Sequence, residues 1–272
     1  MSSRRGYGCG EMRMRDRSGR LDLISVLTDG SRPLASLCRP LLRPLRSRTT
    51  PVPFGGNRGL KFNPEGSAAS FALGVSEPHV QRLIAKYLSP GDVFLDIGAN
   101  VGFYTVMAAR MVGPFGLVYA FEPGREAFQG LERNLERNGL QANVVAVCSA
   151  ISDRAGPERF ESGRESFWSR LLDEDSIATS QKVRRVAAFT IDDWFFSKPE
   201  VRVPAVVKID VEGWELRVLA GGARLLSEHQ PTIICESDQV PGQVVATLSG
   251  FGYTRICQVG RRHILALGSD ST

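Results

Sequence analysis

The sequence lacks any apolar run that reaches the roughly 18 residues needed for a membrane-spanning helix. It also shows no hydrophobic segment of the kind found at the centre of a secretory signal peptide. We therefore expect a protein without a membrane span.

Cysteine and histidine are scarce, and neither has the spacing of a metal site. The five cysteines are Cys9, Cys38, Cys148, Cys235 and Cys257, and the three histidines are His79, His229 and His263. The last three cysteines fall in apolar, strand-like runs, which indicates core thiols in a reducing cytoplasm. The histidines are scattered, and we interpret them as structural or solvent-facing. We accordingly predict a cytoplasmic protein with no bound metal.

Positive charge is concentrated at the start of the chain. The net charge is +5, but residues 1–50 hold 11 Arg against four acids, and the remainder holds 23 Lys and Arg against 25 Asp and Glu. The body is therefore near neutral, which gives no case for nucleic-acid binding. Residues 1–56 are predicted to form a basic, disordered extension. A membrane-surface helix there is an alternative, but three prolines count against it.

The most informative stretch covers residues 93–112, VFLDIGANVGFYTVMAARMV. A short apolar run ends in Asp96, glycines follow at Gly98 and Gly102, and a helical apolar pattern begins at Phe103. This order predicts a strand, a tight turn and a helix, in which the glycines mark a sharp bend or close contact with a ligand. The helix N-terminus suits an anionic group, and Asp96 suits a cation.

The same turn does not fit a dinucleotide. A G-x-G-x-x-G fingerprint starting at Gly98 would need glycine where the chain has Asn100 and Phe103, so an NAD-dependent oxidoreductase is a disfavoured alternative. A nucleoside is still expected, because Glu122 ends the next apolar strand, twenty residues beyond Gly102, where an acid can accept two ribose hydroxyls. S-adenosylmethionine has a ribose and cationic groups but no phosphate, and we predict it as the cofactor.

Strand and helix patterns alternate over the rest of the chain. We expect one α/β domain over residues 57–272, with a Rossmann-like, doubly wound, seven-stranded sheet that is mostly parallel and has an antiparallel C-terminal strand. Expected strands cover 117–121, 143–148, 206–209, 232–235, 253–257 and 263–267, and expected helices 77–88, 126–138, 215–227 and 243–248, after a hairpin near 59–62. Ligands bind at the carboxyl ends of such strands. The side chains at these ends are Asp96, Glu122, Ser149, Asp210 and Glu236.

Five segments in a fixed order, DIGANVGFYT, VYAFEP, NLERNG, VVKIDVEGWE and PTIICE, resemble the FkbM-type methyltransferases. The resemblance covers roughly residues 59–267, with a poor match over 153–185. It implies a class I methyltransferase that uses S-adenosylmethionine and methylates a hydroxyl group of a small molecule such as a sugar, a lipid or a secondary metabolite. We predict as cofactor-binding residues Asp96, Gly98, Asn100, Gly102, Phe103, Tyr104, Glu122, Pro123 and Ser149.

The strand at residues 206–209 ends in charge. Lys208 and Asp210 project to one face of the strand, and Glu212 joins them if the strand continues. Charges at the end of a buried strand are costly unless they are paired or used. The functional interpretation makes these three residues catalytic, with Asp210 contacting the cofactor or the substrate hydroxyl and Lys208 or Glu212 accepting a proton. The alternative is a structural salt bridge with an acid that caps the next helix.

A long segment at residues 153–205 separates the third and fourth expected strands, and it is predicted to shape the substrate pocket. It contains Phe167 and Trp168, whose aromatic rings are expected either to contact substrate or to pack the loop onto the domain. A strand over 182–189 and a helix capped by Thr190 are expected at its end.

Three further alternatives remain open. Asp210, Glu236 and Asp238 have the oxygen ligands that a hard divalent cation prefers, although no metal is predicted. Methylation of nitrogen is less favoured, because an N-P-P-Y type motif is absent. A protein that binds a nucleoside without catalysis is a non-enzymatic alternative, which the intact acids disfavour. The oligomeric state does not follow from the sequence.

Overall fold

A seven-stranded sheet organises the protein. The computed structural model describes residues 43–163, 169–173, 175–179, 182–197 and 201–268. The strand order is β12-β13-β11-β10-β3-β4-β5. The strands are β3 (Val93–Ile97), β4 (Leu117–Phe121), β5 (Val144–Val147), β10 (Val206–Ile209), β11 (Thr232–Glu236), β12 (Arg255–Val259) and β13 (His263–Leu267). Strands β5, β4, β3, β10 and β11 are parallel, and β13 runs antiparallel to both β11 and β12. The predicted fold class is confirmed.

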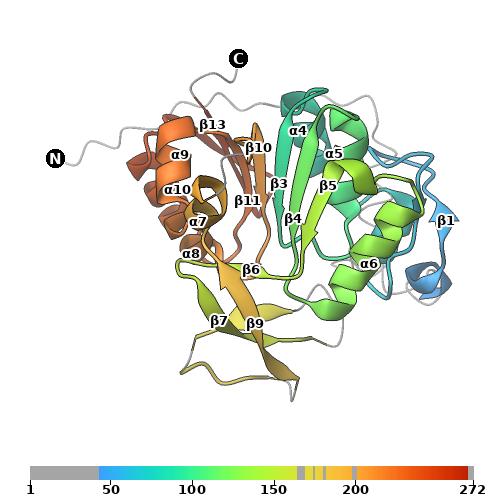
Figure 1. Ribbon diagram of the computed structural model, residues 1–272, viewed down its shortest axis with the longest axis horizontal. Coiled ribbons are helices and arrows are strands. Elements are labelled where there is room, and N and C mark those ends of the chain that lie inside the picture. Colours follow the sequence, from blue (N-terminus) through green and yellow to red (C-terminus); the bar gives the residue numbers. More distant parts are fainter. Residues whose placement is uncertain (1–42, 164–168, 174, 180–181, 198–200, 269–272) are drawn as a thin grey trace.

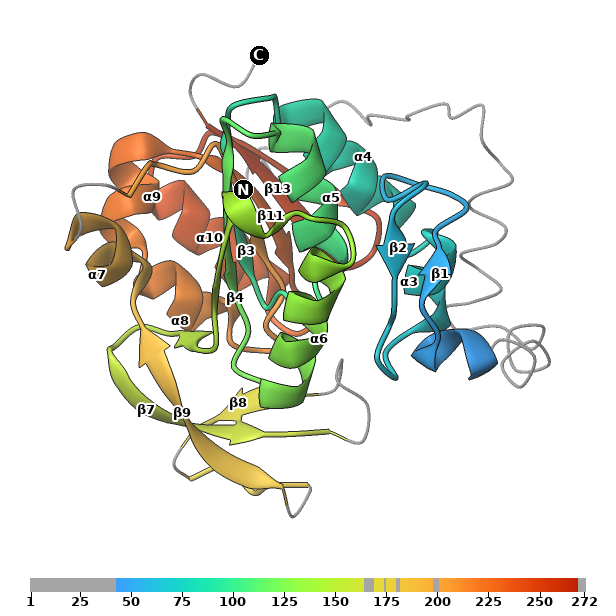
Figure 2. The same ribbon diagram turned by 45° about the vertical axis from the view of Figure 1, so that its right-hand side comes forward.

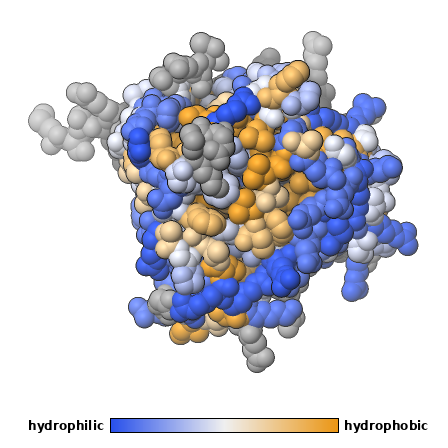
Figure 3. Space-filling view, viewed as in Figure 1, coloured by the Kyte–Doolittle hydropathy of each residue, from blue (hydrophilic) through white to orange (hydrophobic). Residues whose placement is uncertain are grey.

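Helices cover both faces of this sheet (Figures 1 and 2). One face carries α4 (Pro78–Tyr87), α5 (Phe103–Val112) and α6 (Arg125–Glu136), and the other carries α8 (Glu215–Ala220), α9 (Ala223–His229) and α10 (Pro241–Gly250). The outward side of α6 is charged, and a hydrophilic band runs along it in Figure 3.

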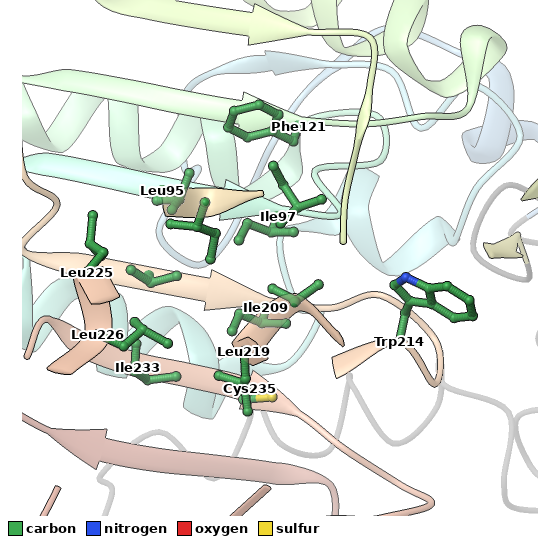
Figure 4. Close-up of a cluster of buried hydrophobic side chains, with 14 of the residues drawn as sticks. Leu95, Ile97, Phe121, Ile209, Trp214, Leu219, Leu225, Leu226, Ile233 and Cys235 are labelled. Atoms are coloured by element: carbon green, nitrogen blue, oxygen red, sulfur yellow. The ribbon is translucent and has the colours of Figure 1, made fainter. Parts of the chain in front are cut away.

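Alternation along the strands divides the core into two clusters. On β3, Leu95 and Ile97 pack toward α8, α9 and α10, whereas Phe94 packs toward α4, α5 and α6. Figure 4 shows the first cluster, in which strand residues such as Ile209 and Ile233 meet Leu219, Leu225 and Leu226 of the helices. Asp96 is two residues from Phe94 along β3, so its side chain points to the same face of the sheet, toward α5.

The structure corrects two expectations. The single helix predicted over 215–227 is two helices, because the chain breaks at Gly221 and Gly222, where a Cβ on Gly221 would lie 2.0 Å from the carbonyl oxygen of Ser152. Of the three thiols predicted in the core, only Cys235 is buried. Cys148 is exposed and Cys257 is half-buried, since β5 and β12 form the two edges of the sheet.

The segment between β5 and β10 folds into a second, smaller sheet of order β6-β9-β7-β8. Its elements are β6 (Ala150–Ile151), β7 (Gly156–Glu161), β8 (Arg170–Leu172), β9 (Val183–Phe189) and the helix α7 (Ile191–Phe196). The predicted strand and cap are confirmed, because Thr190 Oγ1 accepts a hydrogen bond from the Asp193 amide at 2.8 Å. Phe167 and Trp168 lie outside the described residues.

An N-terminal hairpin packs against α6. The described chain starts with η1 (Arg43–Ser47), followed by β1 (Thr50–Pro51) paired antiparallel with β2 (Lys61–Phe62), and then by α3 (Ala69–Leu73). Arg46 donates to the carbonyl oxygen of Ser67 at 2.7 Å, and Val52 and Phe62 are buried. The part of residues 1–56 that the structure describes is therefore packed on the domain. No helix in the described part of the chain has the length and apolar character that crossing a membrane requires.

Asn134 of α6 joins this hairpin to the glycine turn. Its side chain accepts from the Asn63 amide and donates to the carbonyl oxygens of Asn63 and Val101, each at 2.9 Å, in a fully buried position. Asn134→Ala leaves three buried backbone groups unpaired and is expected to destabilise the fold by about 2–4 kcal/mol. The melting temperature should fall by roughly 5–15 °C in a calorimetric scan.

The matched control is Asn138→Ala. Asn138 bonds the same hairpin through the amide and carbonyl of Lys61, but it does so at the exposed surface, so its loss should cost less than about 1 kcal/mol. Equal losses in the two variants would contradict a special role for the buried asparagine.

Candidate active site

A cleft of about 1280 Å³ opens at the carboxyl ends of β3, β4, β10 and β11. Ten of the predicted site residues line it: Gly98, Asn100, Phe103, Tyr104, Glu122, Pro123, Ser149, Lys208, Asp210 and Glu212. Asp96 and Gly102 are buried behind its wall. Ligand pockets usually measure about 300–1,000 Å³, so this cleft has room for a cofactor and a second molecule together.

Protein contacts account for the two glycines of the turn. Gly98 has φ 80°, and a Cβ there would lie 1.9 Å from the carbonyl oxygen of Asp210. Gly102 has φ 85°, and its Cβ would lie 2.4 Å from Leu131 Cδ1 of α6. Glycine is therefore required at both positions for packing. The turn brings the ends of β3 and β10 into contact, which places Asp210 beside the glycine backbone.

Glu122 is held with its carboxylate at the cleft. Its Oε2 accepts from the Asn100 amide at 2.8 Å, and its Oε1 accepts from the Gly124 amide at 2.6 Å. Burial raises the pKa of Glu122 to about 7, even though these amide hydrogen bonds favour the ionised form. A carboxylate has about four acceptor positions, so two remain for hydroxyl donors. The geometry fits a ribose.

Lys208 forms a buried ion pair with two acids. Its Nζ lies 3.0 Å from Asp210 Oδ2 and 3.6 Å from Asp96 Oδ1, while Thr105 donates to Asp96 Oδ2 at 2.7 Å. The ammonium also lies 4.9 Å from the ring centre of Tyr104. Burial would lower the pKa of Lys208, but Asp210 and Asp96 raise it above its ordinary value. Lys208 is thus a fixed cation. Asp210 is the most exposed of the three charged residues, with a side chain 26% exposed in the cleft.

Glu212 lies at the rim of the cleft. It is exposed and has φ 47°, an uncommon conformation for a residue other than glycine. The acidic cap expected here does not form, because the N-cap of α8 is Trp214 and makes no side-chain hydrogen bond. Glu215 Oε1 instead accepts from the Gly213 amide, just before the helix, at 2.8 Å. Asn100 and Glu77, with φ 51° and 40°, also line the cleft. Such strained backbone is concentrated at functional sites in proteins.

Ser149 closes the side of the cleft nearest the small sheet. Its hydroxyl lies 2.8 Å from the carbonyl oxygen of Ala187 in β9 and 3.2 Å from that of Ala150. The side chain therefore ties the small sheet to the end of β5. Phe160, Arg170 and Leu171 of the small sheet line the same cleft.

Sequence reasoning missed a cluster formed by Glu77, Glu236 and His263. His263 Nε2 lies 3.2 Å from Glu77 Oε1 and 3.6 Å from Glu236 Oε2. Glu236 and His263 are register partners in the antiparallel pair of β11 and β13. Glu236 was identified as a strand end, but the partner of an antiparallel strand is not visible in local patterns. Nothing in the sequence pointed to Glu77, which immediately precedes α4.

The metal alternative raised from the sequence does not match these contacts. Asp210 Oδ2 is bonded to Lys208, and Asp238 Oδ2 is bonded to Arg262 at 3.1 Å. The structure instead gathers Glu236 with Glu77 and His263.

The reversed β13 in an otherwise parallel core, the glycine turn after β3 and the acid after β4 define an S-adenosylmethionine-dependent methyltransferase. Residues 96–256, more than half of the chain, match the model of the methyltransferase FkbM domain. The chain belongs to the FkbM methyltransferase family.

Two curated relatives are similar to this chain over more than half of its length. The 31-O-demethyl-FK506 methyltransferase FkbM of Streptomyces tacrolimicus is 30% identical over 200 residues, which cover 63% of this chain and 76% of the relative. The hexuronic acid methyltransferase AglP of Haloferax volcanii is 29% identical over 158 residues, which cover 58% and 61%. The chain thus spans about three-fifths of the second relative. A solved methyltransferase FkbM from Methylobacillus flagellatus has 17% identity, a TM-score of 0.46 and coverages of 73% and 52%.

Glu122→Gln is expected to weaken S-adenosylmethionine binding by about 1.5–3 kcal/mol, the scale of hydrogen bonds to a charged group, or roughly 10- to 150-fold in Kd. We expect the ionised form of Glu122 to be the one that accepts both ribose hydroxyls. Because its pKa is about 7, wild-type affinity should fall about tenfold on going from pH 8 to pH 6.

Calorimetric titrations at pH 6, 7 and 8 check this expectation. The pH dependence should disappear in Glu122→Gln and persist in Glu126→Gln, an exposed acid in the first turn of α6. An unchanged affinity in Glu122→Gln would remove the ribose assignment.

Proposed function

We propose that this protein methylates an oxygen atom of a small polar molecule, most simply a hydroxyl of a sugar, a lipid or a secondary metabolite. The observation that carries the proposal is Asp210, a partly exposed acid held by Lys208 in the same cleft as Glu122. The names of the two relatives, a 31-O-demethyl-FK506 methyltransferase and a hexuronic acid methyltransferase, support oxygen as the acceptor atom.

Five residues of the cleft are assigned to cofactor binding, and each has one task. Glu122 accepts the ribose hydroxyls, and the backbone at Gly98 and Asn100 forms the floor beside them. Phe103 and Tyr104 provide aromatic walls that exclude water from the cleft. When bound, the cofactor supplies a methyl group on a positively charged sulfur.

Charge balance selects Asp210 as the proton acceptor. Asp96 and Asp210 carry two negative charges against the single positive charge of Lys208. One negative charge is therefore left at the cleft surface, where it complements a sulfonium and can accept the proton of an attacking hydroxyl. Lys208 is unsuited to that task, because it stays protonated and orients Asp210 instead. Glu212 is a second acid close enough to the rim to relay the proton to solvent.

Arginines from three other segments also line the cleft. Arg43 and Arg46 come from η1, Arg170 comes from β8, and Arg261 and Arg262 come from the turn between β12 and β13. These segments lie outside the parallel strands that carry the cofactor residues. Arg170 and Arg262 are paired with acids of the protein, but the charge of Arg43 and Arg261 favours an acceptor that bears a carboxylate or a phosphate in addition to its hydroxyl.

Asp210→Asn is expected to lower kcat by roughly a hundredfold or more, because a positioned acid–base group typically contributes 10²–10⁴-fold. The melting temperature should change little, since the amide keeps the shape of the carboxylate and Lys208 still pairs with Asp96. The rate is compared at saturating cofactor, because loss of the negative charge is expected to weaken cofactor binding. Single-turnover transfer of a labelled methyl group is the measurement. The acceptor is the one that reacts fastest in a screen of uronate sugars, neutral sugars, lipids and macrolide hydroxyls.

Glu228→Gln serves as the control, because Glu228 is exposed on α9 and pairs only locally with Arg224 at 3.0 Å in the described structure. It should leave transfer unchanged. Full activity of Asp210→Asn together with lowered stability would show instead that the charged strand end is only structural. A wild-type protein that binds S-adenosylmethionine and methylates none of the four acceptor classes would favour nucleoside binding without catalysis.

A further inference from the structure

Three metal-ligand atoms face one another at the wall of the cleft. They are Glu77 Oε1 just before α4, Glu236 Oε2 at the end of β11 and His263 Nε2 at the start of β13. All three lie within 4.8 Å of one another, with His263 Nε2 at 3.2 and 3.6 Å from the two oxygens. Donor atoms around a cation at about 2.0–2.2 Å are separated by comparable distances.

Each of the three residues has a second polar atom that does not face the cluster, and a neighbouring side chain contacts that second atom. Tyr104 donates its hydroxyl to Glu77 Oε2 at 2.7 Å. Arg262 lies 2.7 Å from Glu236 Oε1, and His79 Nε2 lies 3.0 Å from His263 Nδ1.

This pattern is the usual support of metal ligands. A ligating histidine is fixed by a bond to its second nitrogen, and a ligating carboxylate is fixed by a bond to its second oxygen. When His263 Nδ1–H donates to His79, the lone pair of Nε2 points at two carboxylate oxygens. A cation satisfies all three atoms at once.

The side chains of the cluster include more acids than basic groups, which favours binding of a cation. Glu77, Glu236 and Asp238 are three acids around one arginine, because Arg262 lies 3.8, 2.7 and 3.1 Å from them. The side chains of Glu77 and Glu236 are 17% and 14% exposed, and both line the cleft. A hydrated ion can therefore enter from the cleft and keep open positions toward it.

We propose that Glu77, Glu236 and His263 bind one divalent first-row transition cation at the wall of the cleft. Two carboxylates and an imidazole suit Mn²⁺, Fe²⁺ or Zn²⁺ better than Mg²⁺ or Ca²⁺, which prefer oxygen alone. The open positions face the cleft, so the ion can bind and orient an oxygen of the methyl acceptor. Binding of the ion itself does not depend on the proposed methyl transfer.

Titration of the chelator-treated full chain with Mn²⁺, followed by electron paramagnetic resonance, tests the site. One Mn²⁺ per chain is expected. His263→Gln and Glu236→Gln should each weaken binding at least about a hundredfold, and Tyr104→Phe, which removes only a supporting bond, about 10- to 100-fold. His229→Gln and Glu228→Gln alter an exposed histidine and acid of α9 and should leave binding unchanged.

Pulsed electron paramagnetic resonance of the wild-type Mn²⁺ complex tests the site without any substitution, so its result does not depend on a variant folding correctly. One directly bound imidazole nitrogen should be detected in the Mn²⁺ signal. The proposal is overturned if no saturable binding occurs, if His263→Gln binds as tightly as the wild type, or if the nitrogen coupling is missing. Methyl transfer that persists after chelation would then leave the proposed function intact.

Discussion

The buried ion pair of Lys208 with Asp96 and Asp210 constrains the rest of the structure. Lys208 and Asp96 are 3% and 0% exposed, and they are register partners in the parallel pair of β10 and β3. Leaving such a charge unpaired by removing its partner costs about 3–5 kcal/mol. The adjacency and register of these two strands are therefore fixed by electrostatics as well as by hydrogen bonds. Since β3 also begins the glycine turn, the whole cleft takes its position from this pair.

The glycine turn then closes the cleft around the pair. Gly98 permits the carbonyl of Asp210 to approach the backbone, and Gly102 permits α5 to pack against Leu131 of α6. Once α5 is seated there, Thr105 reaches Asp96 and the ring of Tyr104 lies beside the ammonium of Lys208. The glycines that indicated a sharp bend or close contact with a ligand are thus required first by the packing of the charged network. Contact with a ligand follows from that packing.

Local patterns predicted the sheet and the acids at its strand ends, because each strand, turn and cap is encoded within about ten residues. Alternation along one strand also placed Lys208 and Asp210 on one face, where they pair. The boundary between α8 and α9 was missed, since it depends on contact of Gly221 with Ser152. His79 and His263 are 184 residues apart and meet only through tertiary packing. No local sequence pattern indicates such a contact, so the sequence analysis interpreted the histidines separately, as structural or solvent-facing residues.

The cleft contains two centres of negative charge that are balanced differently. At the first, Lys208 is almost fully buried and pairs with two acids, which leaves one charge that the cofactor's sulfonium can neutralise. At the second, Arg262 is 48% exposed and is surrounded by three acids. Water screens part of that excess, but Glu77 and Glu236 are mostly buried, where screening is weak. A complementary positive charge is therefore favoured at each centre, and both centres lie in the wall of the same cleft.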